Sequence, residues 1–209
     1  MKLRTRAIAA AAAAGLVAAP LMTGTAQAAP GTTSLGDVLL ADTVKGAPSF
    51  DKNGGDFDIL TAAVLGVLGN DEGSTVGVLL DGDVTLTAFI PTDKAFERTA
   101  GDLGITAKNE ANLTNKLVNA LGIETIEQVL LYHVAPEVKI NAKTAAQADG
   151  AKLDMANGET VKVTVKNDGR NLLKDKARGI QNPKVIVTDI NKGNKQIAHA
   201  INRVLLPTL

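Results

Sequence analysis

The two histidines of the chain, His133 and His199, are its most versatile groups for acid–base chemistry or metal binding. Two imidazoles together with carboxylates could hold a metal ion. Their neighbours favour another role, because His133 follows the apolar run Val129–Leu131 and His199 lies between Ile197 and Ile201. We therefore predict two partly buried structural histidines, and a two-histidine metal site is the alternative.

Activated nucleophiles are missing from the sequence. The chain has no cysteine, and its serines, Ser34, Ser49 and Ser74, lie outside any Gly-x-Ser-x-Gly turn. No phosphate-binding loop and no Gly-x-Gly-x-x-Gly segment after a strand is present. The sequence predicts a protein that is not an enzyme, with no catalytic residues and no cofactor.

The segment Asp51–Asp56 is similar to the start of a calcium-binding loop. Such a loop needs oxygen ligands at positions one, three and five and a glutamate at position twelve. Here Gly55 is at position five and Ala62 at position twelve. We therefore predict an ordinary turn followed by a helix cap at Asp56, and no metal site.

Residues 1–28 have the features of a secretory signal peptide of bacterial type. Three basic residues precede an apolar run, and Ala26-Gln27-Ala28 supplies a small-x-small cleavage pattern. No cysteine follows the run that could carry a lipid anchor. We predict export, a short flexible lead over 29–33 and a single domain over 34–207. The expected location is extracellular or loosely associated with the cell wall.

The mature chain begins with helical patterns and ends with strand patterns. Apolar residues recur at helical spacing over 59–68, 109–121 and 125–133, whereas 84–90, 184–190 and 197–206 read as strands. Residues 151–166 alternate around Asn157-Gly158, which predicts a hairpin with a type I′ turn. Helices followed by an antiparallel sheet indicate an α+β fold. Phe89 and Phe96 are expected to meet in its core.

Three segments resemble the fasciclin domain. They are Thr85–Phe96, with the sequence Thr-Leu-Thr-Ala-Phe-Ile-Pro-Thr-Asp-Lys-Ala-Phe; Leu130–Val134, which contains Tyr132-His133; and Val187–Ile190, followed by 197–207. Their order and spacing fit the family, and the likeness covers roughly residues 34–207. One departure is Asn194-Lys195-Gln196, where the family usually has Asn-Gly, so we expect an altered turn before the last strand.

The resemblance implies a wedge of two β-sheets with helices packed along one side. It also implies an extracellular adhesion or matrix-interaction module without catalytic activity, in which Tyr132 and His133 tie a helix to a sheet by hydrogen bonds. In animal relatives, an Asp-Ile pair in the position of Asp189-Ile190 belongs to integrin-binding sequences. This chain lacks the Glu-Pro that precedes that pair, so integrin binding does not transfer. The pair is a candidate partner-binding site, or Asp189 caps a turn and Ile190 fills the core.

Charge is unevenly distributed along a chain that has 22 basic and 22 acidic residues. Such a neutral total argues against a nucleic-acid binder. Residues 34–110 contain 13 acidic and 5 basic residues, whereas residues 160–203 contain 10 basic and 3 acidic ones. A basic sheet would attract an anionic polysaccharide or wall polymer, or else it is a solvated face that resists edge pairing. The candidate partner-binding residues in this region are Lys162, Lys166, Lys174 and Arg178.

These observations favour a secreted, non-enzymatic binding or adhesion module that acts at the cell surface or in the extracellular matrix. Its partner is expected to be a surface or matrix component and not a nucleic acid, and no segment after the signal is expected to span a membrane. The alternative is an extracellular carrier of a small apolar ligand, held in a cleft between helices and sheet. An aliphatic-rich composition is its support.

Overall fold

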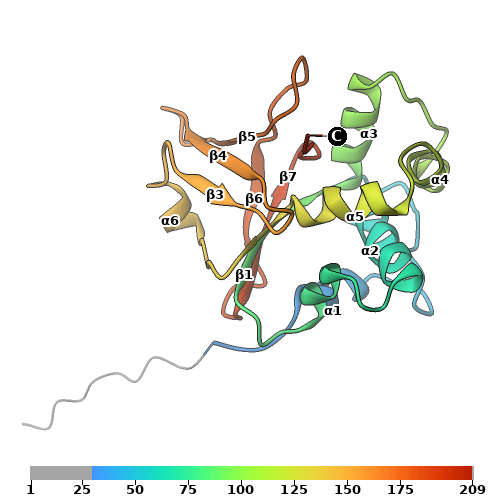
Figure 1. Cartoon of the computed structure of the whole chain (residues 1–209), viewed down its shortest axis with the longest axis horizontal. Helices are drawn as coiled ribbons and strands as arrows, with labels where there is room; N and C mark the ends of the chain where they lie inside the picture. Colours follow the sequence, from blue (N-terminus) through green and yellow to red (C-terminus); the bar gives the residue numbers. More distant parts are fainter. Residues whose placement is uncertain (1–29, 209) are drawn as a thin grey trace, which may run out of the picture.

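Strand β1 (Leu86–Pro91) lies at the centre of the fold, and all six of its residues are buried. In the computed structural model, which describes residues 30–208, β1 pairs with antiparallel β2 (Val134–Pro136) and with parallel β7 (Gln196–Ile201). Strand β6 (Val185–Ile190) pairs antiparallel with β7. This four-stranded central sheet has the order β2-β1-β7-β6 (Figure 1).

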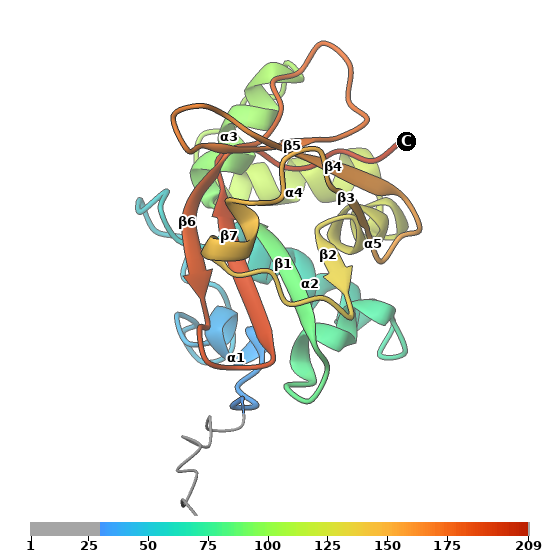
Figure 2. The ribbon, with the colours of Figure 1, turned by 90° about the vertical axis from the view of Figure 1, so that its left-hand side faces the viewer.

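A second sheet packs on the central one. It consists of antiparallel β3 (Lys152–Asp154), β4 (Thr160–Val165) and β5 (Asn171–Lys174), with β4 in the middle. We call it the outer sheet, because one face covers the central sheet and the other is exposed. Figure 2 shows it above the strands of the central sheet.

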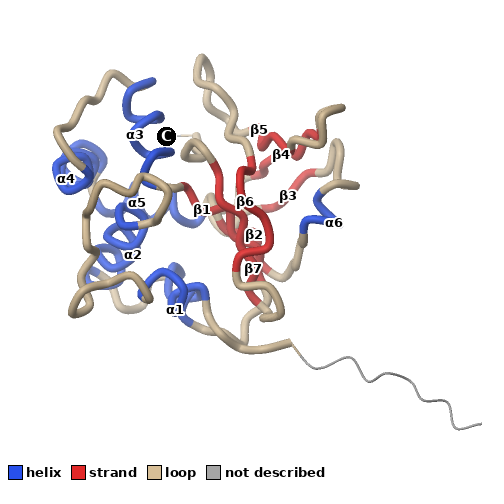
Figure 3. Tube along the Cα trace, turned by 180° about the vertical axis from the view of Figure 1, so that it is seen from behind, coloured by secondary structure: helices blue, strands red, loops and turns tan. Residues whose placement is uncertain are grey.

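The helices gather on the opposite side of the central sheet (Figure 3). They are α1 (Leu35–Leu40), α2 (Asp58–Asn70), the 3₁₀ helix η1 (Thr75–Leu80), α3 (Asp93–Asp102), α4 (Glu110–Leu121) and α5 (Ile123–Leu131). The short α6 (Ala142–Ala145) lies by β3 instead. The expected α+β fold, with two sheets and helices along one side, is confirmed. No helix among residues 30–208 is long and apolar enough to cross a bilayer.

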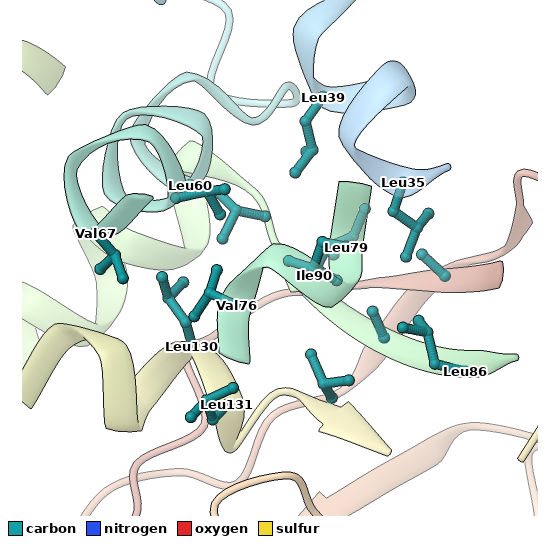
Figure 4. Close-up of a cluster of buried hydrophobic side chains, with 14 of the residues drawn as sticks. Leu35, Leu39, Leu60, Val67, Val76, Leu79, Leu86, Ile90, Leu130 and Leu131 are labelled. Carbon is teal, nitrogen blue, oxygen red and sulfur yellow. The ribbon is translucent and has the colours of Figure 1, made fainter. Parts of the chain in front are cut away.

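The two faces of β1 belong to two different parts of the core. Leu86, Ala88 and Ile90 point into the first cluster, where they meet leucines and valines of the helices (Figure 4). Phe89 points the opposite way, into a second cluster between the two sheets that includes Val161 of β4. Successive side chains of a strand point to opposite faces, so β1 is apolar throughout because both faces are covered.

The expected meeting of Phe89 and Phe96 does not occur. Phe89 is 4% exposed and belongs to the second cluster. Phe96 is half-buried on α3 and packs against the first cluster and against a third one around Ile59 and Leu113. The pleat of β1 turns Phe89 away from the helices, and this separates the rings.

The hairpin predicted at Asn157-Gly158 is present, but its turn is not of type I′. A type I′ turn needs a positive φ at both central residues, and only Gly158, at 85°, has one. The Met155 amide donates to Glu159 and the Gly158 amide to Met155. This is the three-residue loop in which a type I turn ends in a left-handed glycine.

Two further expectations are corrected by contacts that are distant in sequence. Asp56 does not cap α2, because Asp93 does so from α3: its carboxylate accepts from the amides of Asp58, at 3.1 Å, and Ile59, at 2.9 Å. The β-structure is not wholly antiparallel, because β1 and β7 run parallel. The last strand also ends at Ile201 rather than at residue 206.

The N-terminal lead is hydrogen-bonded to the turn before β7. The amide of Gly31 donates to Gly193, and the Lys195 amide donates to Gly31. The Asn194 side chain accepts from the amide of Thr33. The predicted signal peptide, residues 1–28, lies outside the described residues.

Phe89→Ala is expected to lower the free energy of unfolding by about 3–5 kcal/mol, because it opens a cavity between two sheets that cannot collapse freely. Urea denaturation followed by circular dichroism measures the change. Phe96→Ala serves as the control, and it should cost less because Phe96 is only half-buried. Equal losses in the two variants would contradict this division of the core.

Candidate functional site

His133 is buried beside the central sheet, with both ring nitrogens occupied. It is 4% exposed. Its Nδ1–H donates to the carbonyl of Val129 at 2.7 Å, and its Nε2 accepts from the amide of Leu205 at 2.9 Å. Burial lowers the pKa of His133 to about 4. The neutral ring therefore joins the end of α5 to the C-terminal segment and has no nitrogen free for a metal.

Tyr132, the residue before His133, also joins α5 to a distant part of the chain. The side chain is fully buried in the second cluster, and its hydroxyl donates to the carbonyl of Thr160 at 3.2 Å. Burial raises the pKa of Tyr132 to about 12. Together, Tyr132 and His133 connect α5 to the outer sheet and to the chain end.

His199 is held in a similar way on β7. Its Nε2–H donates to the carbonyl of Ile140 at 2.7 Å, and its Nδ1 accepts from the amide of Asp189 at 3.4 Å. The ring stacks on Phe89, with centroids 5.9 Å apart. Burial lowers the pKa of His199. Neither histidine is arranged as a catalytic base or a metal ligand.

The Asp189-Ile190 pair lies where β6 ends. Asp189 has a φ of 60°, and its carboxylate accepts from the amide of Ala142 at the start of α6, 2.7 Å away. Lys192 lies 3.5 Å from the same carboxylate. Ile190 is half-buried and packs against the first cluster. Both side chains are thus engaged within the fold, and Thr188 is the exposed residue beside them.

A row of lysines crosses the exposed face of the outer sheet. Lys152 of β3 is directly opposite Lys162 of β4, which is directly opposite Lys174 of β5. All are exposed. We call these residues the lysine row. Lys162 and Lys174 had been singled out from the sequence, whereas Lys152 was missed because it lies outside the basic segment and only the strand register brings it into line.

The other basic residues of the C-terminal segment do not all join this row. Lys166 is exposed next to β4, and Arg178 is exposed in the loop between β5 and β6. Lys195 instead pairs with Asp83 at 2.7 Å, and Arg203 pairs with Asp102 at 2.8 Å. These two bases lie near the helices, so the positive surface is smaller than the charge count suggested.

An apolar pocket opens among the helices. Its volume is about 140 Å³. It lies between α2, α3, α4, α5 and the C-terminal segment, and not between helices and sheet as the carrier hypothesis expected. The main lining residues are Ile59, Phe96, Leu103, Leu117, Val118, Leu121, Val129, Val204 and Leu206.

Comparison with known proteins identifies the family. A family model described as the fasciclin domain matches residues 68–207, which is more than half of the chain. The chain belongs to the fasciclin-domain family. Fasciclin domains are known as cell-adhesion modules, are generally non-enzymatic and are typically extracellular or on the cell surface.

The fasciclin chain is also similar to a solved structure, that of a FAS1 domain pair from the insect cell adhesion molecule fasciclin I. The sequence identity is 16% and the TM-score is 0.47. The likeness covers 70% of this chain and 46% of that chain, so the fasciclin chain corresponds to less than half of the pair. No curated protein matches the chain.

His133→Ala is expected to lower the free energy of unfolding at pH 7 by about 1–3 kcal/mol, because the Leu205 amide and the Val129 carbonyl lose their buried partner. Chemical denaturation measures the loss. An unchanged midpoint would show that water replaces the imidazole at no cost.

The stability contributed by His133 is expected to depend on pH. Its pKa is about 4 in the folded chain against an ordinary value of 6.5, so between these values the unfolded chain binds the proton and the folded one does not. The contribution is therefore complete above pH 6.5 and declines as the pH falls towards 4, with a slope of up to about 1.4 kcal/mol per pH unit. Subtracting the pH profile of His133→Ala from that of the wild type isolates this term; a pH-independent difference contradicts it.

Proposed function

We propose that this fasciclin domain is a secreted, non-enzymatic adhesion module that attaches to an anionic polymer at the cell surface or in the extracellular matrix. In this proposal the signal over residues 1–28 directs export, and the exposed face of the outer sheet makes the contact. The lysine row is the observation that supports it.

Like charges directly opposite each other on neighbouring strands destabilise a sheet. Lys152, Lys162 and Lys174 nevertheless stand in register, and among residues 30–208 no carboxylate lies within 4.0 Å of their amino groups. Asp154 is on the same face without pairing to them. A bound polyanion would supply the negative charges that the protein does not place next to these three lysines.

The spacing of the lysine row suits a polymer better than a single anion. Neighbouring strands lie about 4.8 Å apart, so the row extends over about 10 Å. One exposed ion pair contributes roughly 0–1 kcal/mol, so useful affinity requires several charges along one chain. Lys166 and Arg178 would extend the contact. Such binding weakens as salt rises.

The carrier hypothesis has one observation in its favour, the apolar pocket among the helices. A cavity of about 150 Å³ lined by similar side chains accepts a ligand of the size of benzene, and this pocket has about 140 Å³. It therefore has room for a small ring or a short alkyl group but not for a lipid. We place this function second.

The variant carrying Lys152→Gln, Lys162→Gln and Lys174→Gln is expected to lose most of its retention on polyphosphate beads and polygalacturonate beads. The expected loss at low salt is about 10–100-fold, because up to about 1 kcal/mol disappears at each lysine. Elution over a series of salt concentrations measures it, and circular dichroism checks the fold.

The matched control carries Lys45→Gln, Lys108→Gln and Lys139→Gln, three exposed lysines on separate loops. It changes the net charge by the same amount and is expected to keep wild-type retention. If both variants lose retention equally, binding follows net charge and not the lysine row. If neither loses any, the outer sheet is not the contact surface.

A further inference from the structure

Five carboxylates from separate segments meet where three helices begin. Asp51 and Asp56 come from the loop before α2, and Asp58, Asp93 and Glu110 are the first residues of α2, α3 and α4. Oxygens of Asp51, Asp58 and Glu110 lie within 4.8 Å of one another, and so do oxygens of Asp56, Asp58 and Asp93. Asp58 belongs to both groups and joins them into one acidic cluster.

Two buried members of the acidic cluster, Asp93 and Asp58, have protein donors, and the exposed Asp51 accepts from the amide of Asn53 at 2.5 Å. Asp93 accepts the amides of Asp58 and Ile59 as the cap of α2. Asp58 accepts from the amide and hydroxyl of Ser49 and from the Asp51 amide, at 3.2–3.4 Å. These contacts fix both carboxylates in place and leave part of their acceptor capacity for another partner.

The other buried oxygens have no donor. Glu110 is only 4% exposed, yet its Oε2 has no hydrogen-bond partner. Both carboxylate oxygens of Asp56 are also buried without a partner. Most buried polar atoms in proteins have a hydrogen-bond partner, so oxygens that lie against other carboxylates need either a shared proton or a positive partner between them.

No side chain supplies that partner. Among residues 30–208, no Lys, Arg or His nitrogen lies within 4.0 Å of a carboxylate oxygen in the acidic cluster. Carboxylates this close together and shielded from water repel one another unless a proton or a cation offsets their charge.

We propose that the acidic cluster binds one Ca²⁺ ion. Calcium takes six to eight oxygen ligands at 2.3–2.6 Å, so any two of its ligand oxygens lie no more than about 5 Å apart, and the oxygens within each group are close enough to meet this limit. Asp56 and Glu110 supply the unpartnered oxygens, Asp58 lies between them, and Asp51 is exposed at the edge. Mg²⁺ demands a stricter octahedron and retains water, which suits a buried carboxylate cluster less well.

An entry path adjoins the acidic cluster. A groove of about 560 Å³ is lined by Asp51, Lys52, Gly54, Lys94, Glu97, Lys108, Asn109 and Glu110. An ion at its inner end would join the beginnings of α2, α3 and α4. This inference is independent of the proposed polymer binding, because the outer sheet contributes no residue to the acidic cluster.

Calorimetric titration of the EDTA-treated protein with CaCl₂ tests the proposal directly. One Ca²⁺ per chain is expected, together with a rise in melting temperature of about 3–6 °C when calcium is ten times its dissociation constant. Absence of both signals up to about 10 mM, above the range of weak extracellular sites, would overturn the site. An equal response to MgCl₂ would overturn the assignment to calcium.

Glu110→Gln and Asp56→Asn locate the site. Each removes a charge but keeps the shape of the side chain, so each is expected to weaken calcium binding at least 10-fold. In EDTA both should melt at or above the wild-type temperature, because a buried negative charge has been removed. Asp56→Asn alone decides the matter if Glu110→Gln does not fold.

Glu97→Gln is the matched control. It removes the same charge from the same groove, but Glu97 is exposed and pairs with Lys94. Its calcium affinity is expected to equal that of the wild type. Unchanged binding in the Glu110 and Asp56 variants, or an equal loss in the control, would show that the acidic cluster is not the calcium site and that its members share protons instead.

Discussion

The burial of β1 on both faces is the constraint on which the rest of the molecule depends. Its backbone groups are satisfied by β2 on one side and by β7 on the other. Its side chains alternate between the helices and the outer sheet. The helices and the outer sheet thus share this strand as a wall, so the helices cannot shift without disturbing the sheets.

Buried polar side chains hold distant segments against this wall. Gln196, which is fully buried on β7, accepts from the amide of Leu35 and donates to the carbonyls of Val78 and Asp81. His133 does the same for the chain end. Each joins backbone groups of separate segments, and a satisfied buried polar group specifies a unique arrangement. The protein has no cysteine and so no disulfide bonds, and these hydrogen bonds hold its distant segments together instead.

Two places in the folded molecule each gather charge of one sign. Carboxylates gather where α2, α3 and α4 begin, and lysines line up across the outer sheet. The helix beginnings carry a partial positive charge that favours acidic residues, whereas the exposed sheet face has no such preference. The two proposed partners, a metal ion and a polyanion, are therefore assigned to different sides of the molecule.

Local patterns in the sequence predicted the α+β class, most element boundaries and the burial of both histidines. They also carried the resemblance to the fasciclin domain. These features can be predicted because periodicity and capping depend on neighbouring residues. The parallel pairing of β1 with β7, the alignment of Lys152 with Lys162 and the convergence of Glu110 with Asp58 came only from the tertiary structure. Asp51–Asp56 does not match a contiguous calcium loop, and only the fold brings the first residues of α2, α3 and α4, which are Asp58, Asp93 and Glu110, close to Asp51 and Asp56. Residues that are distant in the sequence carry no signal of contact in a single chain, and strand register and helix packing decide which of them meet. In the hairpin, the three-residue turn in place of the predicted type I′ turn sets the register that brings Lys152 opposite Lys162.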